Sequence, residues 1–193
     1  HCKEMIIQIF MVFINVLYYF PDNWLEIKMA VNRVILKSMV AIRTTVMVQE
    51  FLGTDKFNQT IWSTYFKLAI AFTTQQRLQL ETLPLWKQRT ILQIYGGDMR
   101  LFMGQELVEC WNLIGASKAS FIPGLISSFV DVTLVPEPNL RRATIPIIYD
   151  MLAADYEKNG NFRSVEAALI DKLDSIAHKQ EFDPEYGKLF TSM

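Results

Sequence analysis

Hydrophobic and polar positions along the chain recur with the period of α-helices. The clearest stretch is Val165, Leu169, Leu173 and Ile176, which are three or four residues apart with charged residues between them. Short groups of Gly, Pro, Asn and Asp separate such stretches, and these residues end one helix and begin the next. The pattern therefore predicts an all-α chain of helices joined by short turns.

Turn and cap residues divide the chain into its expected helices. Thr54 or Asp55 can cap the third helix and Asp98 the fifth, because their oxygens accept the unpaired N–H groups of a first turn. Pro146 falls inside a helical pattern and predicts a kink, or a restart capped by Thr144. The helices are expected at about 5–20, 24–48, 55–72, 84–95, 98–113, 121–134, 140–155 and 165–176, and a last one from 183.

A repeat is visible at the starts of two helices. Met99-Arg100 recurs as Leu140-Arg141, 41 positions later, after a short turn in both cases. Helix pairs that repeat every ~40–47 residues are typical of HEAT and armadillo proteins. We therefore predict a HEAT/armadillo-like α-solenoid of stacked antiparallel helix pairs, with an irregular helical bundle as the competing architecture.

The repeats give an approximate organisation of the chain. Residues 1–193 are expected to form a single helical-repeat fragment of a larger protein. The first residue is not a methionine, and the chain stops without a terminating signal, so both ends look cut. The approximate repeats cover 3–50, 54–95, 97–134 and 138–178, followed by a truncated helix at 182–193.

Residues 5–20 are almost all apolar and could suggest a membrane span or a signal peptide. A span needs ~20 apolar residues, and Gln8 and Asn15 interrupt this shorter stretch. Pro21, Asp22 and Asn23 follow it in place of a small-residue cleavage site. We interpret the stretch as a helix buried in the inner layer of a larger helical protein.

Composition supports a packed fold and narrows its partners. Hydrophobic residues make up 51% of the chain and charged residues 20%, while glycine and proline are scarce, at 8 and 7. The formal net charge of −1 argues against a nucleic-acid binder. Two distant cysteines, Cys2 and Cys110, form no disulfide framework, so a reducing cytosolic compartment fits best.

We find no complete catalytic, metal or cofactor site in the sequence and predict that this fragment is not an enzyme. Cys110 lies within a helix, and the histidines, His1 and His178, stand at opposite ends, so a buried structural thiol is expected. Gly96-Gly97-Asp98 is interpreted as a helix stop and cap rather than a phosphate-binding loop. A set of acids lacks calcium-loop spacing and is interpreted as a solvated face: Asp171, Asp174, Glu181, Asp183 and Glu185.

Basic and aromatic residues also admit structural interpretations. Arg33 and Lys37 share one helix face with Lys28 and Arg43 nearby, where a partner or an anionic lipid could bind, but a solvated outer face is favoured. Two further arginines, Arg141 and Arg142, are expected to make local ion pairs at a repeat corner. The tryptophans are expected to fill the core between layers: Trp24, Trp62, Trp86 and Trp111.

Several sequence motifs follow one another from about residue 78 onward. They are Leu78-Gln79-Leu80-Glu81, Tyr95-Gly96-Gly97-Asp98-Met99-Arg100, Phe121-Ile122-Pro123-Gly124, Val132-Thr133-Leu134-Val135-Pro136-Glu137-Pro138, Arg141, Thr144-Ile145-Pro146-Ile147, Gly160-Asn161-Phe162, Val165-Glu166 and Leu169-Ile170-Asp171-Lys172-Leu173-Asp174-Ser175. In order and spacing these motifs resemble the helical region that precedes the exchange domain of DOCK-family guanine nucleotide exchange factors. The family usually has one glycine where Gly96-Gly97 stand, so this corner is expected to be looser.

The resemblance implies a mechanical role in small-GTPase signalling. The segment would act as a scaffold of an exchange factor for Rho-family GTPases of the Rac type. Within the family, its sequence motifs look most like the branch that acts on Rac and Rap. It would position an upstream lipid-binding domain and a downstream exchange domain, perform no catalysis itself, and respond to an ELMO-type adaptor. The protein would be cytoplasmic and reach the plasma membrane through domains outside this segment. Changes in the packed stripes, such as Leu173→Asp, are then expected to lower exchange activity in cells.

Two alternatives come from other functional classes. A free-standing helical-repeat adaptor would bind peptides or helices on its surface, but its terminal helices should then carry polar caps. An all-α enzyme with paired carboxylates would need acids closer together and a base beside them. The apolar first helix disfavours the adaptor, and the scattered acids disfavour the enzyme.

Overall fold

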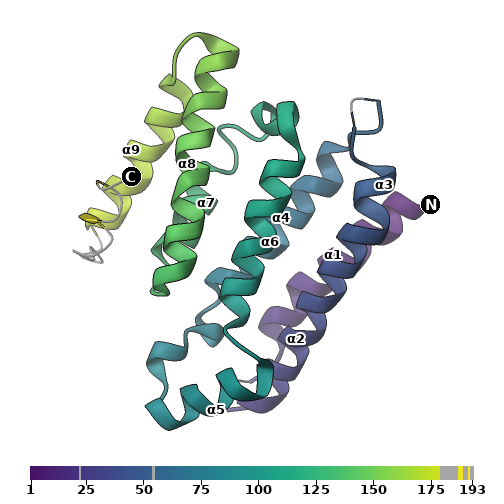
Figure 1. The fold of residues 1–193 in the computed structure, drawn as a ribbon, viewed down its shortest axis with the longest axis vertical. Coiled ribbons are helices and arrows are strands. Elements are labelled where there is room, and N and C mark those ends of the chain that lie inside the picture. The colour runs from purple at the N-terminus through teal and green to yellow at the C-terminus, as the bar shows by residue number, and fades with distance from the viewer. Residues whose placement is uncertain (22, 54, 179–186, 189–190, 192–193) are drawn as a thin grey trace. The chain divides into compact units, whose positions relative to one another are not determined.

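The computed structural model describes residues 1–21, 23–53, 55–178, 187–188 and 191, and this part of the chain contains helices and turns but no strand (Figure 1). The prediction of an all-α chain is confirmed. The chain divides into two compact units, His1–Leu107 and Val108–Met193, which are described separately below. The division into four approximate repeats stays a prediction.

The first unit is built from helices joined by tight turns. The predicted helix at 24–48 corresponds to α2, a π-helical turn and α3, which follow one another without a gap. The elements are α1 (Cys2–Tyr19), α2 (Leu25–Ile42), the π-helical turn η1 (Arg43–Met47), α3 (Val48–Glu50), α4 (Gln59–Thr74), the 3₁₀ turns η2 (Gln76–Leu78) and η3 (Leu80–Thr82), α5 (Leu85–Tyr95) and the first part of α6 (Met99–Leu113).

Helix α4 forms the centre of this unit. It begins after Asn58, whose side-chain oxygen accepts a hydrogen bond from the Ile61 N–H at 3.3 Å, so the predicted cap at Asp55 is wrong. The alternative cap, Thr54, lies outside the described residues. Its apolar residues lie on several faces, and most of them are buried. Phe10 of α1 packs edge-on against Tyr65 with 5.7 Å between ring centroids. This packing explains why a helix with so few polar residues is stable in water.

The corner between α5 and α6 follows the predicted stop and cap. Gly96 has φ 73° and Gly97 has φ 136°, and the Gly97 N–H donates to Leu92 O at 2.8 Å. Asp98 Oδ1 then accepts from the Arg100 N–H at 2.8 Å, which caps α6. Both glycines are needed for this backbone path, since other residues rarely adopt positive φ.

The second unit contains the end of α6, the 3₁₀ segment η4 (Gly115–Ser120), α7 (Ile126–Leu134), α8 (Pro138–Asn159) and α9 (Arg163–His178). Helix α7 begins five residues later than predicted, because residues 121–125 form a turn in which Leu125 N–H donates to Phe121 O. Helix α8 continues through Pro146, so the predicted restart at Thr144 is wrong. The predicted helix at 182–193 lies mostly outside the described residues.

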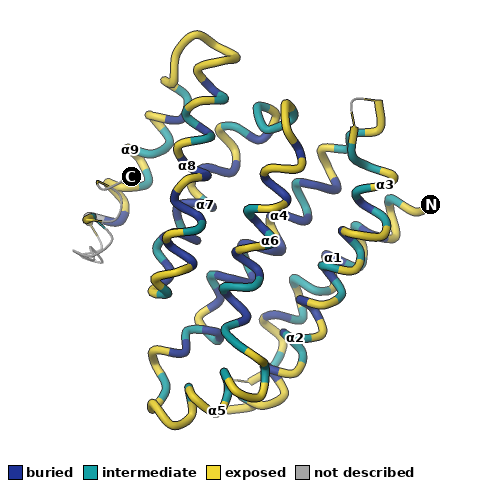
Figure 2. Tube along the Cα trace, in the orientation of Figure 1, coloured by how far each residue is buried: buried dark blue, intermediate teal, exposed yellow. Residues whose placement is uncertain are grey.

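The core of the second unit lies among α6, α7, α8 and α9 (Figure 2). Trp111 packs edge-on against Phe129 with 5.5 Å between ring centroids. Val165 and Ile176 of the predicted α9 stripe are buried, but Leu173 is 41% exposed. The stripe is therefore narrower than its spacing predicts, and Leu173→Asp is a poor probe of packing.

Helix α1 is less buried within this chain than predicted. Its buried residues are Ile6, Phe10 and Leu17, whereas Met5 and Tyr19 are among its exposed apolar side chains. Among the described residues, α1 is the helix that is long and apolar enough to cross a membrane, a test that core helices of soluble proteins also pass. Burial of its outer face in a larger protein stays a prediction.

Candidate functional site

The candidate catalytic residues of the sequence lie in structural settings. Cys110 is buried in α6, as predicted for a structural thiol. His178 is exposed on α9, with Nδ1 2.8 Å from the carbonyl oxygen of Asp174. That this segment carries no catalytic residue stays a prediction.

The acidic set is only partly described. Asp171 and Asp174 are exposed on α9, which agrees with a solvated face, while Glu181, Asp183 and Glu185 lie outside the described residues. Across the described part of the chain, no group of three or more His, Cys, Asp or Glu side chains is close enough to hold a metal ion.

A buried charge cluster surrounds Arg100, which is 1% exposed at the start of α6. Its Nη2 lies 2.8 Å from Glu81 Oε1 and 2.7 Å from Asp98 Oδ2, and its Nη1 donates to Gln79 Oε1 at 2.7 Å. Burial alone would lower the pKa of Arg100, but the hydrogen bonds and negative charge of Glu81 and Asp98 outweigh it and raise the pKa above its ordinary value. The cluster fixes Gln79 and the turn η3 to the start of α6.

A second ion pair joins the π-helical turn to α6. Arg43 Nε lies 2.6 Å from Glu106 Oε2, and Arg43 Nη2 donates to Glu106 Oε1 at 3.0 Å. The Tyr65 hydroxyl also reaches Glu106 Oε2, at 3.4 Å. Paired N–H donors facing one carboxylate make this a bidentate, partly buried pair.

The predicted basic face on α2 is not a single solvated surface. Lys28 and Arg43 are buried, so that interpretation is wrong for these two residues. Arg33 lies over the Tyr95 ring at 5.6 Å and donates to Ile94 O at 3.1 Å, while Lys37 is exposed. Helical spacing placed the residues on related faces, but it did not reveal which face the rest of the unit covers.

In the second unit, polar contacts again hold helices in place. Asp150 Oδ2 accepts from Trp111 Nε1 and from Lys118 Nζ, both at 2.6 Å. Arg141 is buried at the start of α8 and donates to Val135 O at 2.8 Å and Leu134 O at 3.0 Å. The repeated arginines, Arg100 and Arg141, thus both anchor the segment that precedes their helix, a role that the sequence repeat alone did not specify.

The tryptophans divide into a buried and an exposed pair. Trp62 and Trp111 are buried, as predicted, but Trp24 is 47% exposed and Trp86 is 65% exposed, so the prediction is wrong for these two. Helix α5 has no buried residue, which explains the exposure of Trp86. Together with Ile27 and other residues of α2 and α5, the exposed pair lines an open groove of about 610 Å³.

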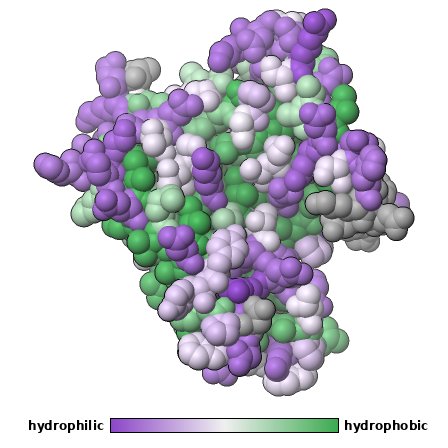
Figure 3. Space-filling view, turned by 180° about the vertical axis from the view of Figure 1, so that it is seen from behind, coloured by the Kyte–Doolittle hydropathy of each residue, from purple (hydrophilic) through white to green (hydrophobic). Residues whose placement is uncertain are grey.

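Hydrophobic side chains also reach the surface elsewhere, among hydrophilic ones, on the face drawn in Figure 3. A separate hollow of the first unit, about 510 Å³, is lined mainly by polar and basic residues, including Lys28, Gln75 and Arg77. Sequence spacing did not bring Lys28 together with Gln75 and Arg77, because these residues meet only through the packing of α2 against the segment after α4. One sequence feature could have indicated a polar site here: the polar residues Gln75-Gln76-Arg77 directly follow an apolar helical stretch.

Comparison with known proteins gives a consistent result. The family model described as the dedicator of cytokinesis (DOCK) TPR region matches residues 1–193. Dedicator of cytokinesis protein 3 of Homo sapiens is 41% identical over 191 residues, covering 98% of this chain and 9% of that protein. Dedicator of cytokinesis protein 4 of Homo sapiens is 39% identical over 193 residues, covering 99% of this chain and 10% of that protein.

The chain therefore spans about a tenth of the length of the curated relatives that it matches. TPR regions are built of helix–turn–helix repeats. The predicted fold class, an all-α solenoid of helix pairs, is confirmed by this match and by the helices described above.

Proposed function

Because the chain belongs to the dedicator of cytokinesis (DOCK) family, we propose that it is a scaffold segment of a guanine nucleotide exchange factor for small GTPases. The GTPase acted on is of the Rac type, and the exchange reaction takes place on a domain outside this chain. The segment holds that domain and a lipid-binding domain at a defined separation. Its partners are these other domains and an ELMO-type adaptor, and its contact with membranes and with the GTPase is indirect.

The observation that carries the proposal is the family match over the whole chain. The geometry supports it, because the buried charged residues described above contact neighbouring segments of their own unit. Arg100, Arg43 and Arg141 each fix one helix to an adjacent turn or helix. Such contacts give a spacer the stiffness that it needs to transmit position between domains. The protein is expected in the cytoplasm, with recruitment to the plasma membrane through the lipid-binding domain.

A second function is favoured by one observation. The exposed tryptophans, Trp24 and Trp86, line an open groove, and exposed aromatic side chains are common where proteins bind one another. A helical-repeat adaptor that binds a peptide or a helix would use such a groove. Under this alternative the chain would bind its partner with no exchange domain present.

The scaffold proposal can be tested with two matched substitutions in the full-length protein. Val165→Asp places a charge at a fully buried position of α9, whereas Ala167→Asp places the same charge at an exposed position two residues away. We expect Val165→Asp to lower GTP loading of Rac in cells by about tenfold at equal protein level, since an unpaired buried charge disrupts packing. The exchange domain, purified by itself, should keep its activity.

Two results would contradict the proposal. Equal Rac loading by the Val165→Asp and wild-type proteins would mean that the packing of this segment does not matter for exchange. Equal loss with Ala167→Asp would mean that the effect comes from added charge rather than from the fold.

A further inference from the structure

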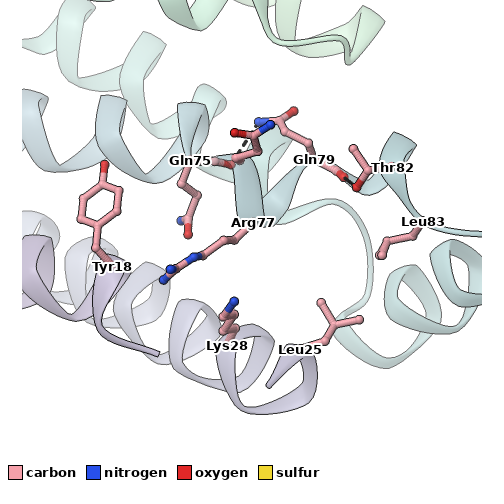
Figure 4. A pocket seen from close by; sticks show the side chains of 9 residues that line it. Tyr18, Leu25, Lys28, Gln75, Arg77, Gln79, Thr82 and Leu83 are labelled. Carbon is pink, nitrogen blue, oxygen red and sulfur yellow. Dashed lines mark hydrogen bonds between the residues drawn. The ribbon is translucent and has the colours of Figure 1, made fainter. Parts of the chain in front are cut away.

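A polar hollow in the first unit lies between the start of α2 and the segment that follows α4. It has a volume of about 510 Å³ and is open on one side. Figure 4 shows Lys28, Gln75 and Arg77 pointing toward one another across it, with Tyr18 at one side. The volume is large enough for several residues of an extended peptide or for a small organic molecule.

The lining of the hollow is positively charged. Lys28 and Arg77 are its charged members, and none of the described residues that line it is an acid. Lys28 is only 4% exposed, although lysine is rarely buried to this extent. Arg77 also donates to Leu17 O at 3.1 Å. Both residues make contacts within the protein, so what they bring to the hollow is positive charge in a partly desolvated place.

Gln75 adds a second requirement for a ligand of this hollow, a hydrogen-bond donor. Its side-chain nitrogen donates to Asn32 Oδ1 at 2.9 Å and to Phe72 O at 3.0 Å, which fixes the orientation of the amide. Its oxygen, Oε1, is buried and has no hydrogen-bond partner, the one such side-chain atom among the described residues. A buried acceptor without a donor destabilises the folded state. A ligand that supplied an N–H or O–H group here would remove that cost.

We propose that this hollow binds an acidic peptide segment. A carboxylate of the peptide would face Lys28 and Arg77, and a backbone N–H close to that carboxylate would donate to Gln75 Oε1. An acidic peptide provides both groups at short spacing, whereas a fully ionised phosphate provides charge and no donor. Recognition of acidic motifs by clustered basic side chains is a general mode of peptide binding. Peptide binding does not depend on the proposed scaffold function, so an experiment can contradict one proposal without contradicting the other.

Binding can be measured by fluorescence anisotropy of a rhodamine-labelled peptide, Gly-Ser-Gly-Asp-Glu-Asp-Glu, with a free carboxyl terminus. The control peptide carries Asn and Gln at the acidic positions and an amidated end. The full chain should bind the acidic peptide saturably. Its affinity for this peptide should be at least about tenfold higher than for the control peptide, a difference of ~1.4 kcal/mol in binding free energy. Equal binding of the two peptides would overturn the proposal.

Variants of the chain locate the site. Arg77→Gln removes a cation from a half-buried position in the hollow and should weaken peptide binding about tenfold. The control is Arg89→Gln, which removes an exposed cation of α5 that does not line the hollow. It should leave peptide binding unchanged. Lys28→Gln should act like Arg77→Gln, and circular dichroism checks that each variant is folded. An Arg77→Gln variant that is folded and binds as tightly as wild type would contradict the assignment.

The role of Gln75 is tested on the peptide. Methylation of its backbone nitrogens, one at a time, removes one donor without changing charge. One position should lose about tenfold in affinity, as expected for a buried acceptor left without a partner. Equal affinity at every position would exclude the hydrogen bond to Gln75. Inorganic phosphate and vesicles containing phosphatidylserine serve as competitors, and binding of either in place of the peptide would overturn the peptide assignment in favour of a phosphate ligand.

Discussion

At the scale of single residues, buried arginines connect neighbouring segments through hydrogen bonds and ion pairs. Arg100 binds Glu81, Asp98 and Gln79, which belong to the turns before α6, while its guanidinium is shielded from water. Shielding makes the charge costly unless every donor has a partner. The cluster is therefore stable only when the turns and the helix are both in place.

Replacing Arg100 with methionine tests this role. The substitution keeps an unbranched side chain about as long as the arginine stem, but it removes the guanidinium and leaves Asp98 without its cation. We expect the free energy of unfolding to fall by about 3 kcal/mol, the lower end of the range for a broken buried pair, because Glu81 keeps contact with water. Urea unfolding followed by circular dichroism measures the change. Arg89→Met, at an exposed position, should change stability by less than about 0.5 kcal/mol.

A matched pair of glycine substitutions tests the backbone at the corner between α5 and α6. Gly97 has φ 136°, and a Cβ there would lie 2.7 Å from the Phe102 ring. Gly97→Ala should therefore lower the melting temperature, with a cost of about 1–3 kcal/mol for a strained backbone. Gly124→Ala is the control, because its Cβ would meet its nearest neighbour, Phe121 O, at an ordinary 3.7 Å. Equal melting temperatures for the two variants would contradict the strain.

Residue types alone predicted some of these roles and missed others. Gly96, Gly97 and Asp98 were predicted correctly as a stop and a cap, since local backbone chemistry determines such signals. The exposure of Trp86 was not predictable in this way, because burial depends on which helices lie next to α5. The arrangement around Arg100 was also missed, since its partners lie up to 21 residues away.

At the scale of elements, one side chain connects two helices of the second unit. Asp155 of α8 is buried, and its carboxylate accepts from the Val165 N–H at 3.3 Å and from Asn159 Nδ2 at 2.6 Å. The bond to Val165 satisfies an N–H in the first turn of α9, which has no partner within the helix. Asp155 therefore helps to fix where α9 begins.

Removing this carboxylate should loosen α9. Asp155→Ala leaves the buried Val165 N–H without its acceptor, which costs about 1–3 kcal/mol. Amide hydrogens in the first turns of α9 should then exchange faster by about tenfold or more, as measured by hydrogen–deuterium exchange. Glu157→Ala, an exposed position on the same helix, should leave exchange unchanged. Unchanged exchange in Asp155→Ala would show that packing alone fixes the start of α9.

Most helices were predictable from the sequence, whereas several of their ends were not. Asn58, rather than Asp55, caps α4, because either residue type can cap a helix and only the folded chain selects one. Helix α7 begins at Ile126 because the preceding residues form a turn. Helix α8 passes through Pro146 because packing of its other residues maintains a helix that proline alone would interrupt.

At the scale of the whole molecule, the proposal is that this segment positions other domains. Its two units each have a buried core, Trp62 in the first and Trp111 in the second. Each packed unit keeps its own shape, whereas a flexible linker of equal length samples many end-to-end separations. A direct test must therefore compare the activity of the protein with the packed segment and with a flexible linker in its place.

That test replaces the segment in the full-length protein. One version carries a Gly/Ser linker in place of residues 1–193, and the other carries the matching segment of dedicator of cytokinesis protein 4, which is 39% identical. GTP loading of Rac is measured in cells at equal protein level. We predict that the linker version loses most of its activity and that the relative's segment retains it. Full activity of the linker version would contradict the scaffold account.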